Sequence, residues 1–196
     1  MYLMQLQKRT MAIAGLVMFG YLIFHMLSNL TFFSKELFNE FYQWYNAGII
    51  RWLVLSVMVV VIGVHVRTAL KIRVINANAR SVNYYRHDKV KLPAFVVTAS
   101  LLFLLFFIII HVIQTLGFST VDVHQETVIL FQSFWMLIFY IAGLFVLSMH
   151  LQHSLANVMQ TLGKTSVTSQ SLAWLVTLSL AAGFALLPIY IYFVMQ

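Results

Sequence analysis

Residues 92–117 read LPAFVVTASLLFLLFFIIIHVIQTLG and contain no Asp, Glu, Lys or Arg. A helix rises about 1.5 Å per residue, so about 20 apolar residues cross the hydrocarbon of a bilayer. This stretch is long enough and apolar enough to do so. Its one ionisable side chain is His111. The stretch therefore predicts a membrane-spanning helix with a histidine inside it.

Four further stretches have the same character, and together the five take up most of the 196 residues. We expect an all-α integral membrane bundle that forms one domain over residues 1–196. The second and fourth helices are expected to run on past the inner membrane face, and Gly163 is well placed to cap the fourth. No room is left for a soluble domain, so water-side chemistry must come from partner subunits. The apolar cores are Thr10–Phe33, Ile49–Val66, Leu92–Gly117, Val128–Leu151 and Ser171–Val194, and the helices are expected over about 10–33, 49–75, 92–117, 128–160 and 171–194.

The net charge of +7 is spread unevenly along the chain. Ten of the twelve basic residues, in 8–9, 67–91 and Lys164, fall on one side of the predicted topology, and four of the five acids fall on the other. By the positive-inside rule, the N-terminus is cytoplasmic and the C-terminus is outside. The distribution of charge therefore indicates how the chain is oriented in a bacterial or archaeal cytoplasmic membrane. We expect the chain to contact membrane lipid and not to bind nucleic acid.

The chain has no cysteine. Disulfides, iron–sulfur ligation and covalent haem attachment through a C-x-x-C-H motif are therefore excluded. Any cofactor must bind without thiolates.

Four histidines each lie in a different one of the first four predicted helices: His25, His65, His111 and His150. Ionisable side chains at membrane depth are costly and mark a functional site by default. His87 and His124 fall in predicted loops, and His153 lies one turn beyond His150.

Depth sorts these four histidines into two pairs. The helix rise places His25 roughly 22 Å beyond Thr10 and His111 roughly 27 Å beyond Pro93, both on outward-running helices. On the inward-running helices it places His65 roughly 20 Å beyond Trp52 and His150 roughly 33 Å beyond Val128. We therefore expect His25 to face His111 near the outer face and His65 to face His150 near the inner face.

Two imidazoles that face each other at one depth can ligate a planar iron macrocycle from both sides. Zinc more often takes tetrahedral ligands clustered at one depth. A proton pathway usually includes Asp or Glu within the membrane, and the predicted spans contain neither. The pattern therefore favours two non-covalent b-type haems, while a haem-free transporter with histidines along its path stays as an alternative.

Residues near these pairs have two interpretations each. Gly15, Gly20 and Gly143 can let a broad ring approach the backbone, or can serve ordinary helix packing. The basic side chains just inside the inner pair, Arg67, Lys71 and Arg73, can bind haem propionates or can be orientation charge only.

Short motifs accompany the histidines in order along the chain. They are Gly20-x4-His25-x3-Asn29-Leu30, His65-x3-Ala69-Leu70 followed by Asn78-Ala79-Arg80 and Tyr84, His111, and His150-x2-His153 followed by Gln160-Thr161-Leu162-Gly163. In this order they resemble the single-chain dihaem cytochrome b anchor of succinate:quinone oxidoreductases, the family of succinate dehydrogenases and fumarate reductases. Ser81 and Ser154 depart from that pattern, which often has proline and glycine there.

The resemblance implies axial haem ligation by the four membrane histidines, with His153 as an alternative to His150. It also implies a cytoplasmic flavoprotein subunit that interconverts succinate and fumarate, an iron–sulfur subunit that exchanges electrons with the inner haem, and quinone chemistry on this chain. Quinone, either menaquinone or ubiquinone, is expected near the outer haem in some members. The candidates by position are Glu40, Trp44, Arg51 and Glu126, although an interfacial Trp often serves only as an anchor. A hydrogenase or nitrate reductase cytochrome b subunit is the nearest alternative.

Overall fold

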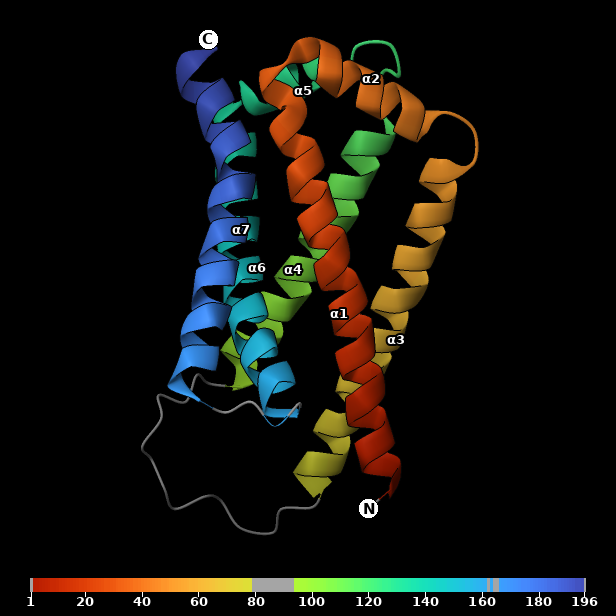
Figure 1. The fold of residues 1–196 in the computed structure, drawn as a ribbon, viewed down its shortest axis with the longest axis vertical. Helices are drawn as coiled ribbons and strands as arrows, with labels where there is room; N and C mark the ends of the chain where they lie inside the picture. Colours follow the sequence, from red (N-terminus) through yellow and green to blue (C-terminus); the bar gives the residue numbers. More distant parts are fainter. Residues whose placement is uncertain (1, 79–93, 162, 164–165, 196) are drawn as a thin grey trace.

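The computed structural model describes residues 2–78, 94–161, 163 and 166–195, and these form helices and no strand. Five of the described helices are long and apolar enough to cross a membrane: α1, α3, α4, α6 and α7. They run along one another, and the two chain termini lie at opposite ends (Figure 1). In order, the elements are α1 Tyr2–Leu30, the 3-10 turn η1 Thr31–Phe33, α2 Lys35–Asn46, α3 Ile50–Asn78, α4 Ala94–Leu116, α5 Val123–Phe131, α6 Phe134–Thr161 and α7 Val167–Val194.

The helix predicted over 128–160 is wrong at its start. The chain forms α5, turns at Gln132 and Ser133, and begins the membrane-spanning α6 at Phe134. The side chain of Asp122 caps α5 by accepting a hydrogen bond from the backbone N–H of Gln125 at 3.0 Å. Val128 thus belongs to α5, which lies at the same end of the bundle as α2 (Figure 1).

A second short helix, α2, connects the first two spans, where the sequence analysis placed none. Its first turn is capped by Ser34, whose hydroxyl accepts from the N–H of Leu37. It buries Phe38 on one side and exposes polar residues on the other. Gly48 has φ +60, a left-handed conformation that suits glycine, and so permits the turn into α3.

The helix predicted over 92–117 is close to the observed α4, whereas the first, second and fifth extend beyond a predicted end. The first begins at Tyr2, the second continues to Asn78, and the fifth begins at Val167. Gly163 has φ +73 and donates to the carbonyl of Gln160 at 3.0 Å, as a helix C-cap does. Several residues that carried sequence predictions lie outside the described residues: Ala79, Arg80, Ser81, Tyr84, His87, Pro93, Leu162 and Lys164.

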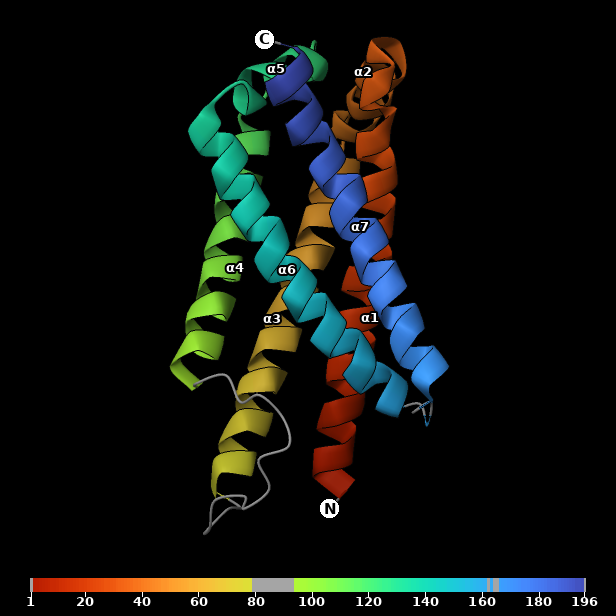
Figure 2. The same cartoon turned by 90° about the vertical axis from the view of Figure 1, so that its left-hand side faces the viewer.

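The helix α1 lies at the centre of the packing, against α3 on one side and α7 on the other, while α6 packs against α7 and α4 (Figure 2). We use "outer end" for the end with α2, α5 and the C-terminus, and "inner end" for the opposite one. A buried apolar cluster of the described residues lies near the outer end, where α2 and α5 cover the long helices. Its members are Phe32, Phe38, Leu104, Phe107, Val123, Val128, Phe131, Tyr140, Leu187 and Ile191.

Candidate functional site

The outer pair joins α1 to α4. The ring centroids of His25 and His111 are 5.7 Å apart and their planes are inclined by 60°. Each histidine lies five residues before the end of its helix, at Leu30 or Leu116, so both have the same depth.

Aromatic side chains from three helices surround this outer pair. Tyr21 stacks on His25 at 5.6 Å and 7°, and Phe184 of α7 lies 5.6 Å from the same ring. Phe107 stacks on His111 at 6.2 Å and 17°. The outer pair therefore lies in an apolar and aromatic environment.

The inner pair joins α3 to α6. The centroids of His65 and His150 are 6.1 Å apart, with planes at 82°. The membrane-spanning part of α3 ends at Ile75 and that of α6 ends at Gln160, ten residues beyond each histidine. The two rings thus lie at one depth near the inner end.

The depths calculated for His65 and His150 agree better when that of His150 is counted from Phe134, where α6 begins, than from Val128. Measured from the outer ends of their helices by the helix rise, His65 lies about 22 Å beyond Ile50 and His150 about 24 Å beyond Phe134. The distance counted from Val128 was too long because Val128 belongs to α5.

The helix α1 passes both pairs. A Cβ placed on Gly15 would lie 3.8 Å from Cε1 of His65, so α1 contacts the inner pair at Gly15. His25 lies ten residues further along the same helix, which corresponds to about 15 Å at 1.5 Å per residue. The two pairs are thus stacked along the bundle, and the helix rise puts about 15 Å between their levels.

Each pair suits a metal that needs only two protein ligands. A metal about 2 Å from each of two opposed imidazole nitrogens places the ring centroids about 6 Å apart, close to the spacing of both pairs. Among the described residues no group of three or more His, Asp or Glu side chains is arranged to hold a metal ion. A zinc site takes three or four protein ligands, whereas haem iron takes protein ligands along its axis only. The donor set therefore fits haem better than a bare metal ion.

The ring of His65 interacts with the backbone of Met11, and in the described part of the chain few other hydrogen bonds reach the inner pair. The Nδ1 atom of His65 is buried and has no hydrogen-bond partner in the described part of the chain. Buried polar atoms are nearly always paired, so an unpaired imidazole nitrogen is compatible with a ligand role. The Nε2 atom of His150 is 3.5 Å from the hydroxyl of Ser154.

The outer pair carries a longer chain of hydrogen bonds. The Nδ1 atom of His111 lies 3.2 Å from the hydroxyl of Tyr140, which donates to Oε1 of Gln114 at 2.8 Å. The amide nitrogen of Gln114 donates to the sulfur of Met136 at 3.3 Å. Tyr140 and Gln114 were not among the residues predicted from the sequence, since neither side chain is ionised at neutral pH.

His153 is exposed at the inner end of α6 and accepts a hydrogen bond on Nε2 from the amide of Asn157 at 3.0 Å. His150, one turn deeper, is the ring that contacts His65. The geometry therefore places His150 rather than His153 opposite His65.

The glycines proposed near the cofactor differ in their surroundings. Gly143 is buried under Phe107, since a Cβ there would lie 2.5 Å from the ring. Gly20 is exposed, and a Cβ on it would meet nothing within 4 Å. Packing therefore accounts for the small residue at position 143, whereas at position 20 no described neighbour requires it.

The basic residues below the inner pair also differ. Arg67 and Lys71 are exposed on α3. Arg73 donates from Nη1 to the hydroxyl of Thr98 at 3.0 Å, which connects α3 to α4. Arg73 thus takes part in a contact between helices.

The four residues considered for quinone are not brought together. Glu40 and Trp44 are exposed on α2, and Glu126 is half-buried on α5. The Cζ atom of Arg51 lies 5.0 Å from the centre of the Trp52 ring, and its Nε is buried with no hydrogen-bond partner among the described residues. No hydrogen bond, ion pair or ring contact joins any two of these four in the described part of the chain.

A tyrosine cluster lies between Arg51 and the outer pair. Tyr45 of α2 hydrogen-bonds Tyr21, the residue stacked on His25. Tyr42 donates to Oδ1 of Asn29 at 2.7 Å. Burial raises the pKa of Tyr42 to about 12 and also raises the pKa of Tyr45, so both phenols keep their protons. This cluster was not predicted from the sequence, because two of its tyrosines lie on α2, which was not predicted either.

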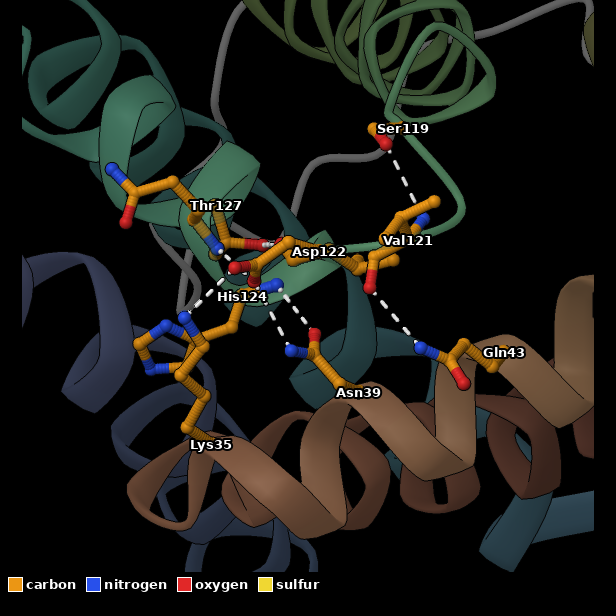
Figure 3. A network of polar contacts seen from close by, with 10 residues as sticks. Lys35, Asn39, Gln43, Ser119, Val121, Asp122, His124 and Thr127 are labelled. Carbon is orange, nitrogen blue, oxygen red and sulfur yellow. Dashed lines mark hydrogen bonds and ion pairs between the residues drawn. The ribbon is translucent and has the colours of Figure 1, made fainter.

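A polar network ties α2 to the segment before α5 (Figure 3). Lys35 forms an ion pair with Asp122 at 2.8 Å, and Asn39 donates to Asp122 at 3.1 Å while accepting from the N–H of His124 at 2.9 Å. The hydrogen bond from Lys35, with those from Gln125 and Asn39, lowers the pKa of Asp122 to about 2. The carboxylate is therefore ionised at neutral pH and holds the two segments together.

We call α2, α5 and the polar network between them the outer cap. His124 was predicted to lie in a loop, but it lies on α5 and is part of this cap. Its ring stacks on Phe32 at 4.2 Å and 9°, and the residue is buried on α5. Burial, followed by the charge of Lys35, lowers its pKa.

Comparison of the chain with models of known protein families, with curated proteins and with solved structures gave no match. Any assignment of function therefore depends on the residues and geometry described above.

Proposed function

We propose that this chain is a dihaem cytochrome b that anchors a succinate:quinone oxidoreductase in the membrane and passes electrons between an iron–sulfur subunit and quinone. The observation that carries the proposal is the presence of two histidine pairs, with ring centroids 5.7 Å and 6.1 Å apart, at two depths of one apolar bundle.

In this proposal His25 with His111 would hold one b-type haem, and His65 with His150 would hold a second. The haems supply one-electron transfer when bound. The chain holds each ligand pair on two different long helices, so the distance between the two rings depends on how the α1–α3 pair and the α4–α6 pair are placed relative to each other. The separation of about 15 Å between levels divides a path through the bilayer into two steps.

The choice of complex follows from the ordered motifs around His25, His65, His111 and His150, together with their resemblance to the succinate:quinone oxidoreductase anchor. The exposed Arg67 and Lys71 at the inner end fit a site where acidic groups of a haem or of a soluble subunit approach. The flavoprotein and iron–sulfur subunits would bind at this inner end, on the cytoplasmic side by the positive-inside rule.

Quinone would bind at the outer end, near His25. The buried and unpaired Nε of Arg51 is a donor suited to a quinone oxygen, and Tyr45 and Tyr21 connect that region to the outer pair. Glu40 and Glu126, both at the outer surface, would exchange protons with water. Trp44 is exposed and serves as an interfacial anchor in this arrangement.

The test is the haem content of the purified chain by pyridine haemochrome, before and after replacing each of the four ligands with alanine. Two haems per chain are expected, falling to one or none in each variant. His153→Ala and His124→Gln are matched controls that should keep two haems. Circular dichroism in detergent would show that each variant is still helical.

Wild-type chain that is correctly assembled in haem-replete cells and contains no haem would overturn the proposal and favour the transporter alternative. Loss of haem in His153→Ala but not in His150→Ala would move the inner ligand by one turn. Purification with flavin and iron–sulfur clusters is expected, and a different soluble module would refute the succinate:quinone assignment.

A further inference from the structure

The hydrogen-bond chain beside His111 has a fixed direction. Gln114 donates from its amide nitrogen to Met136, so its Oε1 is the end that faces Tyr140. An amide oxygen accepts only, and therefore the single hydroxyl proton of Tyr140 points to Gln114. The oxygen of Tyr140 can then only accept from His111, 3.2 Å away.

This direction fixes the protonation of the imidazole. In neutral histidine one ring nitrogen carries the proton and the other has a lone pair. Because Nδ1 of His111 donates to Tyr140, its Nε2 carries the lone pair. The chain of Met136, Gln114 and Tyr140 thus selects the one tautomer that leaves Nε2 available for a metal.

We propose that Tyr140 and Gln114 are positioning residues for the outer haem ligand: they fix the tautomer of His111 and make its imidazole a stronger donor to iron. The inference depends on the proposed haem-binding function and deepens it. A hydrogen bond from the second ring nitrogen of a metal-bound histidine raises the basicity of the ligand, and losing such a partner costs about 10- to 100-fold in metal affinity or activity.

In the described part of the chain no side-chain hydrogen bonds like those of Tyr140 and Gln114 reach the ring of His65. A more basic imidazole stabilises the oxidised iron relative to the reduced iron, since the oxidised iron has the higher charge. The hydrogen-bond chain therefore lowers the midpoint potential of the outer haem only.

The variant that tests this is Tyr140→Phe, studied in the full chain with its native partners. It keeps the ring that packs on Phe131 and Phe107 and removes only the hydroxyl. Potentiometric titration of the two haems should show one midpoint raised, by about 59 mV for each tenfold loss of preference for the oxidised state. Low-temperature electron paramagnetic resonance should show a changed signal for one haem only.

Gln114→Leu should raise the same midpoint by a smaller amount, since the hydroxyl of Tyr140 would lose the acceptor that polarises it and would accept more weakly from Nδ1. Tyr190→Phe, which changes a phenol on α7 that packs edge-on against Phe33, is the matched control and should leave both midpoints unchanged.

Two haems with unaltered midpoints and unaltered resonance signals in Tyr140→Phe would overturn the positioning role while leaving the dihaem proposal intact. A wild-type chain without haem would overturn the dihaem proposal, and the positioning role with it. An equal shift in both midpoints would also contradict the inference, because the contact is made by His111 alone.

Discussion

Gly143→Ala tests how closely α6 approaches the outer pair. The new Cβ would lie 2.5, 2.6 and 2.7 Å from Cδ2, Cε2 and Cγ of Phe107. That ring is 7% exposed and is enclosed by Phe139, Tyr140 and His111, with centroids 5.4, 5.3 and 6.2 Å away. Because the ring has little space to move into, overpacking should cost about 1–3 kcal/mol.

Gly183→Ala is the matched control, since it also adds one methyl group to a packed part of a long helix. Its Cβ would meet the sulfur and Cγ of Met26, whose flexible side chain can turn aside more easily than the enclosed ring of Phe107. Both variants gain about 1 kcal/mol of helix propensity, so that gain cancels when they are compared. Gly143→Ala should therefore be less stable than Gly183→Ala by about 1–3 kcal/mol.

The measurement is unfolding by sodium dodecyl sulfate in detergent micelles, followed by circular dichroism. Adding Phe107→Leu to Gly143→Ala should recover most of the loss, because the two positions are in contact. Equal stability of the two alanine variants, to within about 0.5 kcal/mol, would show that Phe107 does not lie against Gly143 and would refute this packing.

Three further outcomes are expected. Gly20→Ala should stabilise the chain by about 1 kcal/mol in the same unfolding measurement, because its Cβ meets no described atom; loss of one haem instead would indicate that the macrocycle passes Gly20. The pKa of His124 is lowered in the folded chain, so the free energy of unfolding should fall as pH drops below about 6.5. The fall should be smaller in His124→Gln, and identical pH profiles of the two proteins would contradict the burial of this ring. Asp122→Asn should lower the free energy of unfolding at neutral pH. This difference from wild type should disappear as pH falls from the ordinary pKa of 3.8 toward about 2, where the wild-type carboxylate is protonated as well. An equal difference at acid and neutral pH would show that the ion pair with Lys35 is not the cause of the destabilisation.

The five spans could be predicted from composition because lipid leaves little freedom. A helix that crosses a bilayer must be apolar along about 20 residues, and this demand is visible in any window of the sequence. The sorting of His25, His65, His111 and His150 by depth used the same constraint together with the helix rise. The structure places the same residues in contact, although the haems remain a proposal.

The break between α5 and α6 could not be predicted in this way. Residues 128–134 stay largely apolar across the turn at Gln132 and Ser133, so hydropathy shows no boundary. The boundary is set by the N-terminal cap at Asp122, by the ion pair with Lys35, and by burial of α5 on other helices. These are contacts between distant parts of the chain, which a local pattern does not contain.

Helix α2 was not predicted either, although its sequence indicates a helix more clearly than the sequence at the break between α5 and α6 indicates a turn. Ser34 precedes a turn that contains Glu36, and Phe38 with Tyr42 places apolar and aromatic side chains on one face. A search for long apolar stretches does not find it, because a helix of 12 residues is too short to cross a membrane. The tyrosines that connect Arg51 to His25 were missed with it.

The outer cap joins the ends of the two helices that carry the outer histidine pair. Phe32 follows directly from α1 and stacks on His124, while Asp122 and Val121 follow from α4 and bind Lys35 and Gln43 of α2. The cap therefore ties together the two helices that carry His25 and His111, each five residues from its end. The inner pair has no comparable cover in the described part of the chain, where the residues near it on α3 are exposed or half-buried apart from Thr68 and Ile72. The outer pair is therefore held by contacts that the chain itself makes between α2 and the segments that follow α1 and α4.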